Sequence, residues 1–164
     1  MMADYTIRPL LDSEHDFLRK MFYESLFLPQ GADPFPRTII DRPDLARYIQ
    51  NWGSGAHDLA LVAQGQTELL GMVWGRSVKQ GYGYIDDQTP EIGIAIRESY
   101  RGQGLGTALI RAIQQKYLEL DVQRLSLSTD KRNPAKRLYE RMGFEVVADE
   151  EMSCTMLWDR SQSL

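Results

Sequence analysis

The chain has 164 residues, of which 43% are hydrophobic and 26% are charged, and this size and mixture are typical of one globular domain with a buried core. The net charge of −4 argues against a general nucleic-acid binder, and no apolar run approaches the roughly 20 residues that a membrane span needs. Residues 1–5 lack the start of a secretory signal, and the single cysteine, Cys154, excludes an internal disulfide, so we expect a cytoplasmic protein without a membrane partner.

The N-terminal half of the chain predicts two helices separated by a proline-rich loop, followed by a β-hairpin. Ser13 precedes apolar residues at helical spacing and is expected to cap the first helix. Pro43 suits the first turn of a second helix, which Gly53 ends. The expected elements are a strand at 5–8, helices at 13–27 and 42–52, and strands at 59–63 and 69–75. Residues 78–90 are compatible with either a loop or a strand extension.

The C-terminal half alternates strands with helices. Asn133 and Pro134 are expected to begin its second helix, and Gly143 to end it. The expected strands lie at 91–96, 125–129, 144–148 and 152–158, and the helices at 104–120 and 133–142. Hairpins therefore coexist with crossover helices, which predicts an α/β layered domain with a mixed sheet.

A glycine-rich segment, Arg101-Gly102-Gln103-Gly104-Leu105-Gly106, stands at the entrance of the helix that follows strand 91–96. Glycine lets the backbone approach a ligand closely, and the first turn of a helix offers unpaired N–H groups, so the segment suits a phosphate. A P-loop is excluded because Thr107 follows the last glycine where a P-loop has lysine. A dinucleotide fingerprint fits poorly, because the glycines fall as Gly-x-Gly-x-Gly.

The charge of the chain is divided unevenly. Residues 97–141 carry ten Lys or Arg and five Asp or Glu, so this segment has a charge of +5 and the remainder a charge of −9. A basic block in an acidic protein suits a polyanionic small ligand, although basic residues on helix surfaces are commonly only solvated.

Two blocks of the sequence resemble the GCN5-related N-acetyltransferase (GNAT) family. Arg101-x-x-Gly104-x-Gly106 matches the family signature Arg/Gln-x-x-Gly-x-Gly/Ala, and Asn133-Pro134-Ala135-x-x-Leu138-Tyr139-x-x-x-Gly143-Phe144 is similar to its other conserved block. The resemblance is specific over residues 91–144 and extends to the rest only in element order. It implies a single acetyltransferase domain over residues 1–164, with a mostly antiparallel central sheet of about seven strands flanked by about four helices.

The resemblance implies acetyl-coenzyme A as the donor, without a metal. In the family, backbone amides of the glycine-rich loop hold the pyrophosphate, and the preceding strand splays from its neighbour and pairs with the pantetheine arm. One freed N–H group, which we assign to Ile94, would polarise the thioester carbonyl. The implied donor-binding residues are Ile94, Ala95, Ile96, Arg101, Gly102, Gln103, Gly104, Leu105, Gly106, Thr107, Asn133, Ala135 and Tyr139.

Two residues are candidates for the chemistry. Tyr139 matches the family's general acid, which protonates the departing thiolate, and otherwise it would be a core aromatic. Glu91 is the leading candidate for the general base, acting directly or through water, because several family members place a carboxylate before the donor-binding strand. The competing interpretation of Glu91 is a surface charge at a strand start. Asp86 and Asp87 are held in reserve as bases or as attractors of a cation.

The acceptor is expected to be a primary amine, either a small molecule or a peptide. In the family, the acceptor site is built from the first two helices and the adjoining loops, which here contain aromatic residues and carboxylates. This mixture suits a small cationic amine. The candidate acceptor-binding residues are Phe27, Tyr82, Tyr84 and Asp86.

Two other functions stay open at this point. The first is a non-catalytic acyl-coenzyme A sensor or partner module, and the second is a dinucleotide-dependent enzyme, which the glycine spacing disfavours. The two histidines and the cysteine have no metal-ligand spacing, so we expect no metal site. Homodimers are frequent in the family, and the sequence leaves the oligomeric state open.

Overall fold

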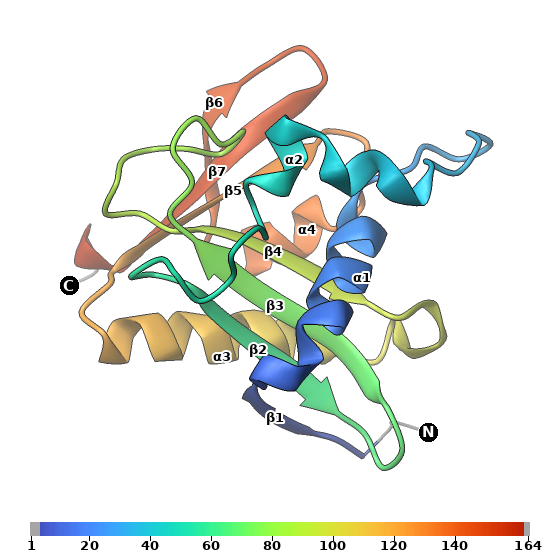
Figure 1. Ribbon diagram of the computed structural model, residues 1–164. Helices are drawn as coiled ribbons and strands as arrows, with labels where there is room; N and C mark the ends of the chain where they lie inside the picture. The colour runs from blue at the N-terminus through green and yellow to red at the C-terminus, as the bar shows by residue number, and fades with distance from the viewer. Residues whose placement is uncertain (1–3, 163–164) are drawn as a thin grey trace.

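The computed structural model describes residues 4–162, which form one sheet with helices on both faces (Figure 1). Within these residues the sheet has seven strands in the order β1-β2-β3-β4-β5-β7-β6. The strands are β1 (Thr6–Pro9), β2 (Leu59–Gln64), β3 (Leu69–Arg76), β4 (Glu91–Ile96), β5 (Arg124–Asp130), β6 (Glu145–Asp149) and β7 (Ser153–Asp159). The helices are α1 (His15–Ser25), α2 (Pro43–Ala46), α3 (Leu105–Glu119) and α4 (Lys136–Arg141), with short 3-10 helices at Asp12–Glu14, Arg37–Asp41, Glu98–Tyr100 and Arg160–Gln162.

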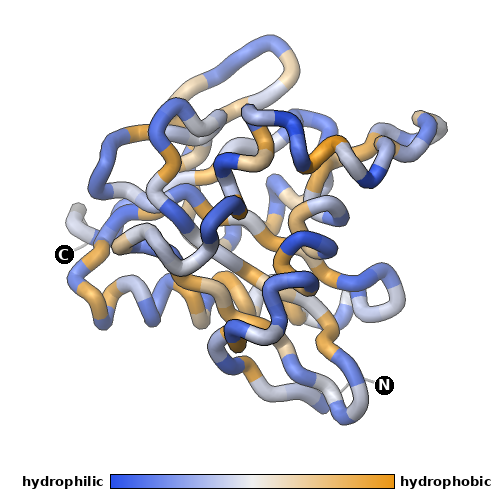
Figure 2. Tube along the Cα trace, in the orientation of Figure 1, coloured by the Kyte–Doolittle hydropathy of each residue, from blue (hydrophilic) through white to orange (hydrophobic). Residues whose placement is uncertain are grey.

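The sheet carries a hydrophobic core on each face. The helices α3 and α4 pack on one face, and α1 with the segment around α2 packs on the other (Figure 1). Successive side chains of a strand point to opposite faces, so Leu61 of β2 joins the α3 core while its neighbour Val62 joins the α1 core. Figure 2 shows hydrophobic segments concentrated in the strands and hydrophilic ones in the outer loops. Among the described residues, no helix is both long and apolar enough to cross a membrane.

The sheet is antiparallel at every junction except the one between β4 and β5. This parallel pair is formed only at its beginning, where Glu91 lies beside Ser126 and the Ser126 N–H donates to the carbonyl oxygen of Pro90 at 2.9 Å. The two strands then separate. The edge of β4 from Ile92 to Ile96 is therefore not paired with β5, which confirms the expected splay of this strand.

The helix around α2 is shorter than the sequence predicts. The α-helix ends at Ala46, and residues 47–53 form turns, with Asn51 and Gly53 in the left-handed region at φ 52° and 98°. A left-handed Asn51 cannot continue an α-helix, and the guanidinium of Arg76 on β3 stabilises the turns instead by donating to carbonyl oxygens of this segment. These oxygens belong to Arg47, Gln50 and Asn51.

The start of α1 also differs from the prediction that Ser13 caps it. Ser13 lies inside the 3-10 helix Asp12–Glu14, and the α-helix begins at His15. The carboxylate that satisfies a backbone donor there is Glu14, which accepts the N–H of Leu11 at 2.9 Å. The segment 78–90, which the sequence leaves open, is a loop with turns and contains no strand.

Candidate active site

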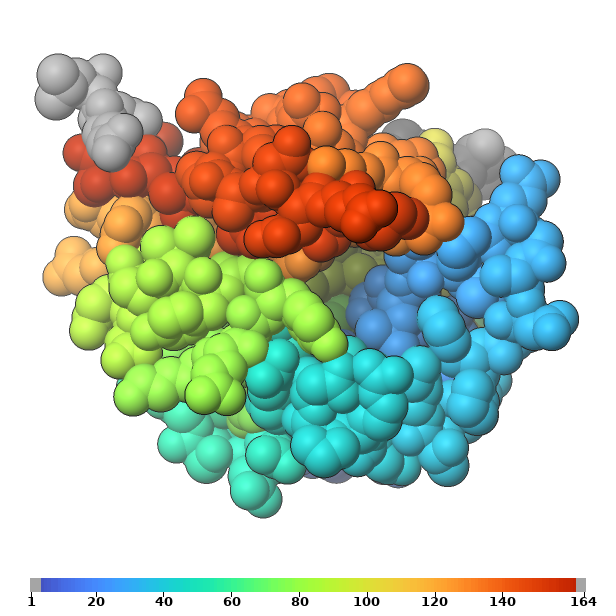
Figure 3. Space-filling model, turned by 90° about the horizontal axis from the view of Figure 1, so that it is seen from above, coloured from blue at the N-terminus to red at the C-terminus, as the bar shows by residue number. Residues whose placement is uncertain are grey.

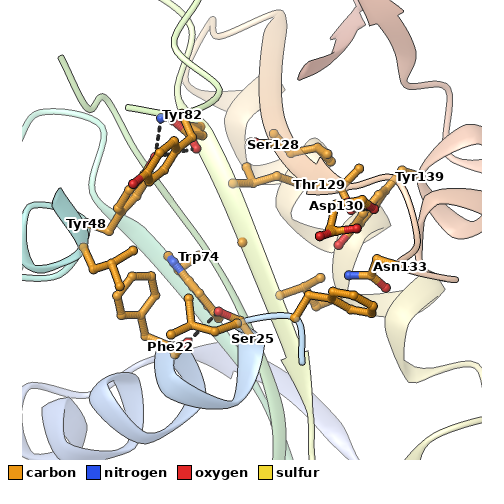
Figure 4. A pocket seen from close by; sticks show the side chains of 18 residues that line it. Phe22, Ser25, Tyr48, Trp74, Tyr82, Ser128, Thr129, Asp130, Asn133 and Tyr139 are labelled. Atoms are coloured by element: carbon orange, nitrogen blue, oxygen red, sulfur yellow. Dashed lines mark hydrogen bonds between the residues drawn. The ribbon is translucent and has the colours of Figure 1, made fainter. Parts of the chain in front are cut away.

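Two neighbouring cavities lie at the gap between β4 and β5. The inner cavity, of about 260 Å³, reaches from α1 across β4 to α4 (Figure 4). Its mouth is the hollow in Figure 3 between the segments of α1, α2, the loop 78–90 and the β6–β7 hairpin. The outer groove, of about 550 Å³, runs along β4 towards the start of α3. The residues that line both are Ser25, Leu26, Phe27, Ile94, Asn133 and Tyr139.

The glycine-rich loop closes one end of the outer groove. Gly102 and Gly104 have φ values of 76° and 85°, a left-handed conformation that a side chain disfavours. Gly104 is the N-cap of the 15-residue helix α3, so the first N–H groups of that helix have no partner within it. A Cβ atom on Gly106 would lie 2.9 Å from Cδ2 of Leu138, so the glycine lets α3 approach α4.

Positive charge at this end comes from Arg101, which lines the outer groove. Its Nε donates to the carbonyl oxygen of Ile96 at 3.0 Å, which fixes the loop to the end of β4. Unpaired amides, the positive end of the α3 dipole and this guanidinium together suit a phosphate group. The resemblance implies that residues 102–107 hold the pyrophosphate of an acyl-coenzyme A, and this end of the groove is compatible with such a group.

The free edge of β4 continues the groove from the loop to the inner cavity. Ala95 and Ile96 line the outer groove, and Ile94 lines both cavities. Backbone groups on this edge are not paired with β5, so an extended ligand can bind them as an added strand would. The structure thus brings Ile94, Ala95 and Ile96 into one line with the glycine-rich loop.

Tyr139 stands where the two cavities meet. It belongs to α4, it is 9% exposed, and its ring packs edge-on against Phe144 with centroids 6.3 Å apart. Within residues 4–162 its hydroxyl has no hydrogen-bond partner, although both cavities reach it. Burial raises the pKa of Tyr139 to about 12, so the phenol stays protonated at neutral pH and can donate a proton.

Asn133 lies beside Tyr139 (Figure 4). Its Oδ1 accepts the N–H of Ala135 at 2.9 Å, as a cap would. The first turn after it is not α-helical, however, and α4 begins at Lys136. Asn133 also lines both cavities, and Ala135 lines the outer groove.

Glu91 is a buried carboxylate at the first residue of β4, and it lines the inner cavity. The side chain is only 7% exposed, which excludes the surface interpretation. Its Oε2 accepts the hydroxyl of Tyr48 at 2.9 Å, and its Oε1 is buried without a hydrogen bond within the described chain. Burial raises the pKa of Glu91 to about 7, while the Tyr48 hydroxyl, the Gly83 amide and the Arg47 charge act in the opposite direction.

Several aromatic side chains belong to the remaining wall of the inner cavity. Phe27 and Tyr82, two of the candidate acceptor-binding residues, line it. Sequence reasoning did not single out Phe22, Tyr48 and Trp74, which also line the inner cavity. The ring centroids of Phe22 and Trp74 lie 6.2 Å apart, and those of Phe22 and Tyr48 lie 5.8 Å apart.

Two predicted acceptor-binding residues lie outside both cavities. Asp86 forms an ion pair with Arg124 and accepts the hydroxyl of Thr89 at 2.9 Å. Tyr84 donates to Asp87 at 2.8 Å on the exposed side of the loop 78–90. The carboxylate that does line the inner cavity, besides Glu91, is Asp130 at the end of β5, which the sequence analysis did not single out.

Asp130 is not available as a free charge. Its carboxylate accepts the Nε and Nη2 of Arg132 at 3.0 and 2.8 Å, and this pairing lowers its pKa. The Arg132 guanidinium lies over the ring of Phe27, 5.5 Å from its centroid. Glu91 is therefore the carboxylate of the inner cavity without a cationic hydrogen-bond partner.

A family model and a relative of known sequence match most of this chain. The model described as the acetyltransferase (GNAT) family matches residues 19–144. A protein of Bacillus subtilis strain 168, provisionally named as a ribosomal protein bS18-alanine N-acetyltransferase, is 38% identical over 146 residues. The match covers 88% of this chain and 83% of that protein.

Solved structures share the fold. The PaiA N-acetyltransferase of Thermoplasma acidophilum, solved in complex with coenzyme A, superposes with a TM-score of 0.70 at 16% identity and covers 95% of this chain and 99% of its own. The ribosomal-protein-S18-alanine N-acetyltransferase of Escherichia coli gives a TM-score of 0.66 at 16% identity, with 98% and 97% covered. At this level of identity these two neighbours carry the fold alone.

Proposed function

Because the chain belongs to the acetyltransferase (GNAT) family, we propose that it transfers an acetyl group from acetyl-coenzyme A to a primary amine by direct attack in a ternary complex. The observation that carries the proposal is the meeting of the two cavities at Ile94 and Tyr139. The outer groove suits the donor and the inner cavity suits the acceptor, so the thioester and the amine meet between a buried phenol and a buried carboxylate.

The donor would be held along the outer groove. The amides of residues 102–107 and the charge of Arg101 suit the pyrophosphate, and the free edge of β4 suits the pantetheine arm. The bound donor supplies an acetyl thioester. The backbone N–H of Ile94, placed at the junction, would donate to the thioester carbonyl oxygen as negative charge develops there.

Glu91 would act as the general base. An amine must lose a proton before or during attack, and an ammonium group holds its proton with a pKa of about 10. A carboxyl whose pKa lies near 7 takes protons more readily than an ordinary glutamate and is still partly ionised at neutral pH. The proton passes to Glu91 directly or through water.

Tyr139 would act as the general acid. When the new C–N bond forms and the C–S bond breaks, the electron pair of that bond leaves with sulfur as a thiolate. The phenol of Tyr139 gives its proton to the thiolate and regains one from solvent afterwards. Its position at the junction and its free hydroxyl support this role.

The acceptor would be a primary amine attached to a group narrow enough to enter the inner cavity. An inner cavity of about 260 Å³ with several aromatic side chains in its wall suits a small cationic amine or the first residue of a peptide. Two of the similar proteins are named as N-acetyltransferases of an alanine of a ribosomal protein, and these names support the peptide alternative. The positions of Asp86 and Tyr84 outside the cavity remove part of the argument for a polycation.

The test is a free-thiol assay with acetyl-coenzyme A and a panel of amines that includes small monoamines, polyamines, aminoglycosides and peptides with a free N-terminus. We expect thiol release above hydrolysis with at least one narrow primary amine and none with its tertiary analogue. Binding of coenzyme A in calorimetry without thiol release from any amine would contradict an enzyme and would support an acyl-coenzyme A sensor.

A further inference from the structure

A short segment of the loop 78–90 presses directly on Glu91. We call Gly81, Tyr82 and Gly83 the strap. A Cβ atom on Gly81 would lie 2.4 Å from Oε1 of Glu91, and one on Gly83 would lie 3.1 Å from its Cδ. Neither glycine has a positive φ, so the backbone conformation does not require glycine there. The two glycines are needed for close approach to the carboxyl group.

The strap crosses the sheet where β4 and β5 begin to separate. A Cβ atom on Gly83 would also lie 2.8 Å from the carbonyl carbon of Leu127 and 3.0 Å from the nitrogen of Ser128, both on β5. Because both atoms belong to the backbone, a side chain at position 83 would have to displace the strap from the sheet. The strap therefore covers Glu91 from the side that the strand splay would otherwise expose.

Tyr48 connects the strap to the carboxylate. Its hydroxyl accepts the N–H of Tyr82 at 2.7 Å and donates to Oε2 of Glu91 at 2.9 Å. The rings of Tyr48 and Tyr82 are stacked, with centroids 6.5 Å apart and an angle of 6° between their planes. The hydroxyl of Tyr82 donates in turn to Asp44 of α2. One tyrosine thus fixes both the strap and one oxygen of Glu91.

We propose that the strap and Tyr48 are positioning residues for Glu91: the strap keeps water away from the carboxyl group, and Tyr48 fixes its orientation. The proposal rests on the proposed function, in which Glu91 is the base. Gly81 and Gly83 do not line the inner cavity, and Tyr48 and Tyr82, which do, have a second role here through Glu91. They act by setting how strongly the carboxylate holds a proton.

The charged and titratable groups around Glu91 are few, and most are already paired. Arg47 lies over the rings of Tyr48 and Tyr82. On β3, Arg76 is the register partner of Glu91, but its guanidinium is paired with Asp58. On β5 the register partner is the uncharged Ser126. Across the inner cavity stand Tyr139 and Asp130, the latter paired with Arg132.

The strap and Tyr48 have opposite effects on the pKa of Glu91. Burial disfavours the carboxylate, whereas the amide of Gly83 in the strap favours it. Burial is the larger of the two effects, so a loosened strap should let Glu91 ionise at lower pH. The hydrogen bond from Tyr48 favours the carboxylate, so its removal should make Glu91 ionise at higher pH. A merely structural role for these residues would not produce shifts of opposite sign.

The experiment compares Gly83→Ala and Tyr48→Phe with the unchanged protein, and it measures the acidic limb of kcat/KM against pH. For Gly83→Ala the midpoint should fall by at least one unit, which raises activity at pH 6 about fivefold relative to the plateau. For Tyr48→Phe it should rise by about one unit, which lowers relative activity at pH 7 about fivefold. Glu91→Gln should abolish the limb.

Two control variants have matched chemistry away from the site. Gly65→Ala crowds the backbone oxygen of Glu68 at 3.0 Å, and Tyr100→Phe removes a hydroxyl bonded to the Glu68 carboxylate at 2.6 Å. Both should leave the midpoint unchanged. Circular dichroism shows whether the Gly83→Ala variant folds. If that variant does not fold, Tyr48→Phe, which keeps the aromatic ring, still tests the proposal.

A titration followed by carbon-13 NMR of the Glu91 carboxyl group separates the two levels of inference, because it needs no turnover. Opposite shifts in the two variants support the strap even if no amine is acetylated. Unmoved carboxyl titrations in both variants overturn it. An acidic limb that persists in Glu91→Gln would instead remove Glu91 as the base and leave the strap to be judged by the NMR titration.

Discussion

At the scale of single residues, Tyr139 combines burial with a hydroxyl that bonds to no other described residue. Its ring is fixed against Phe144, and the phenol faces both cavities. Packing therefore holds the ring, while the oxygen is left for a reacting group. The same position would be filled by phenylalanine if packing were its whole purpose.

The substitution Tyr139→Phe should lower kcat roughly 100-fold and change the affinity for coenzyme A little, because it removes the proton donor and keeps the packed ring. Steady-state kinetics with calorimetry of coenzyme A binding measures both effects. An unchanged kcat would show that the phenol is a core residue. A matched control is Tyr117→Phe, which removes a hydroxyl bonded to the backbone oxygen of His57 at 2.7 Å, away from the cavities.

Sequence reasoning reached the residues of this site that belong to local motifs. The glycine-rich loop and the block around Asn133 and Tyr139 are contiguous, so their spacing is legible in one sequence. Tyr48 could not be found in this way, because its partner Glu91 is 43 residues away and only the fold brings them together. Asp86 was chosen for its charge, and its ion pair with Arg124 is equally a product of the fold.

At the scale of elements, most strands and helices lie where periodicity predicts, and the exception around α2 has a cause in another element. The buried guanidinium of Arg76 on β3 bonds to three backbone oxygens of residues 47–51 and to both oxygens of Asp58. Burial would raise the pKa of Asp58, but Arg76 and the N–H groups of Gly55 and Gly53 outweigh it and lower the pKa. The helical spacing of residues 42–52 gives no indication of these long-range contacts of Arg76.

Replacing Arg76 with methionine should therefore destabilise the fold by about 3–5 kcal/mol, because it leaves Asp58 as an unpaired buried carboxylate. Urea unfolding at neutral pH measures the change in the free energy of unfolding. The matched control is Arg42→Met in the exposed pair with Asp44, where a loss below about 1 kcal/mol is expected. Equal losses in the two variants would contradict the structural role given to Arg76.

At the scale of the whole molecule, a buried glutamate makes the stability of the fold depend on pH. The pKa of Glu91 is raised from 4.5 to about 7, so the folded state prefers the neutral carboxyl group. The favourable contribution of that group is fully present below pH 4.5 and is lost as the pH rises through 7. A base poised near neutrality therefore costs stability in the range where it works.

The variant Glu91→Gln should consequently gain stability over the unchanged protein as the pH rises. The difference in the free energy of unfolding between the two should grow by about 3 kcal/mol from pH 4 to pH 8, and most of the change should fall between 4.5 and 7. Urea titrations at a series of pH values measure it. A difference that stays constant with pH would mean that Glu91 ionises as an ordinary surface carboxylate does.

The pairing of β4 with β5 at one end only divides the sheet into two parts that diverge beyond Glu91 and Ser126. Glu91 lies on β4 at the point where the two strands begin to diverge, and Tyr139 lies on α4, which follows β5 in the chain. The gap between β4 and β5 therefore determines both the width of the outer groove and the distance between Tyr139, the proposed acid, and Glu91, the proposed base. Widening this gap to admit a bulkier acyl chain would also move the two proton-transfer groups apart. The range of acyl donors and the turnover rate are therefore geometrically linked in this fold.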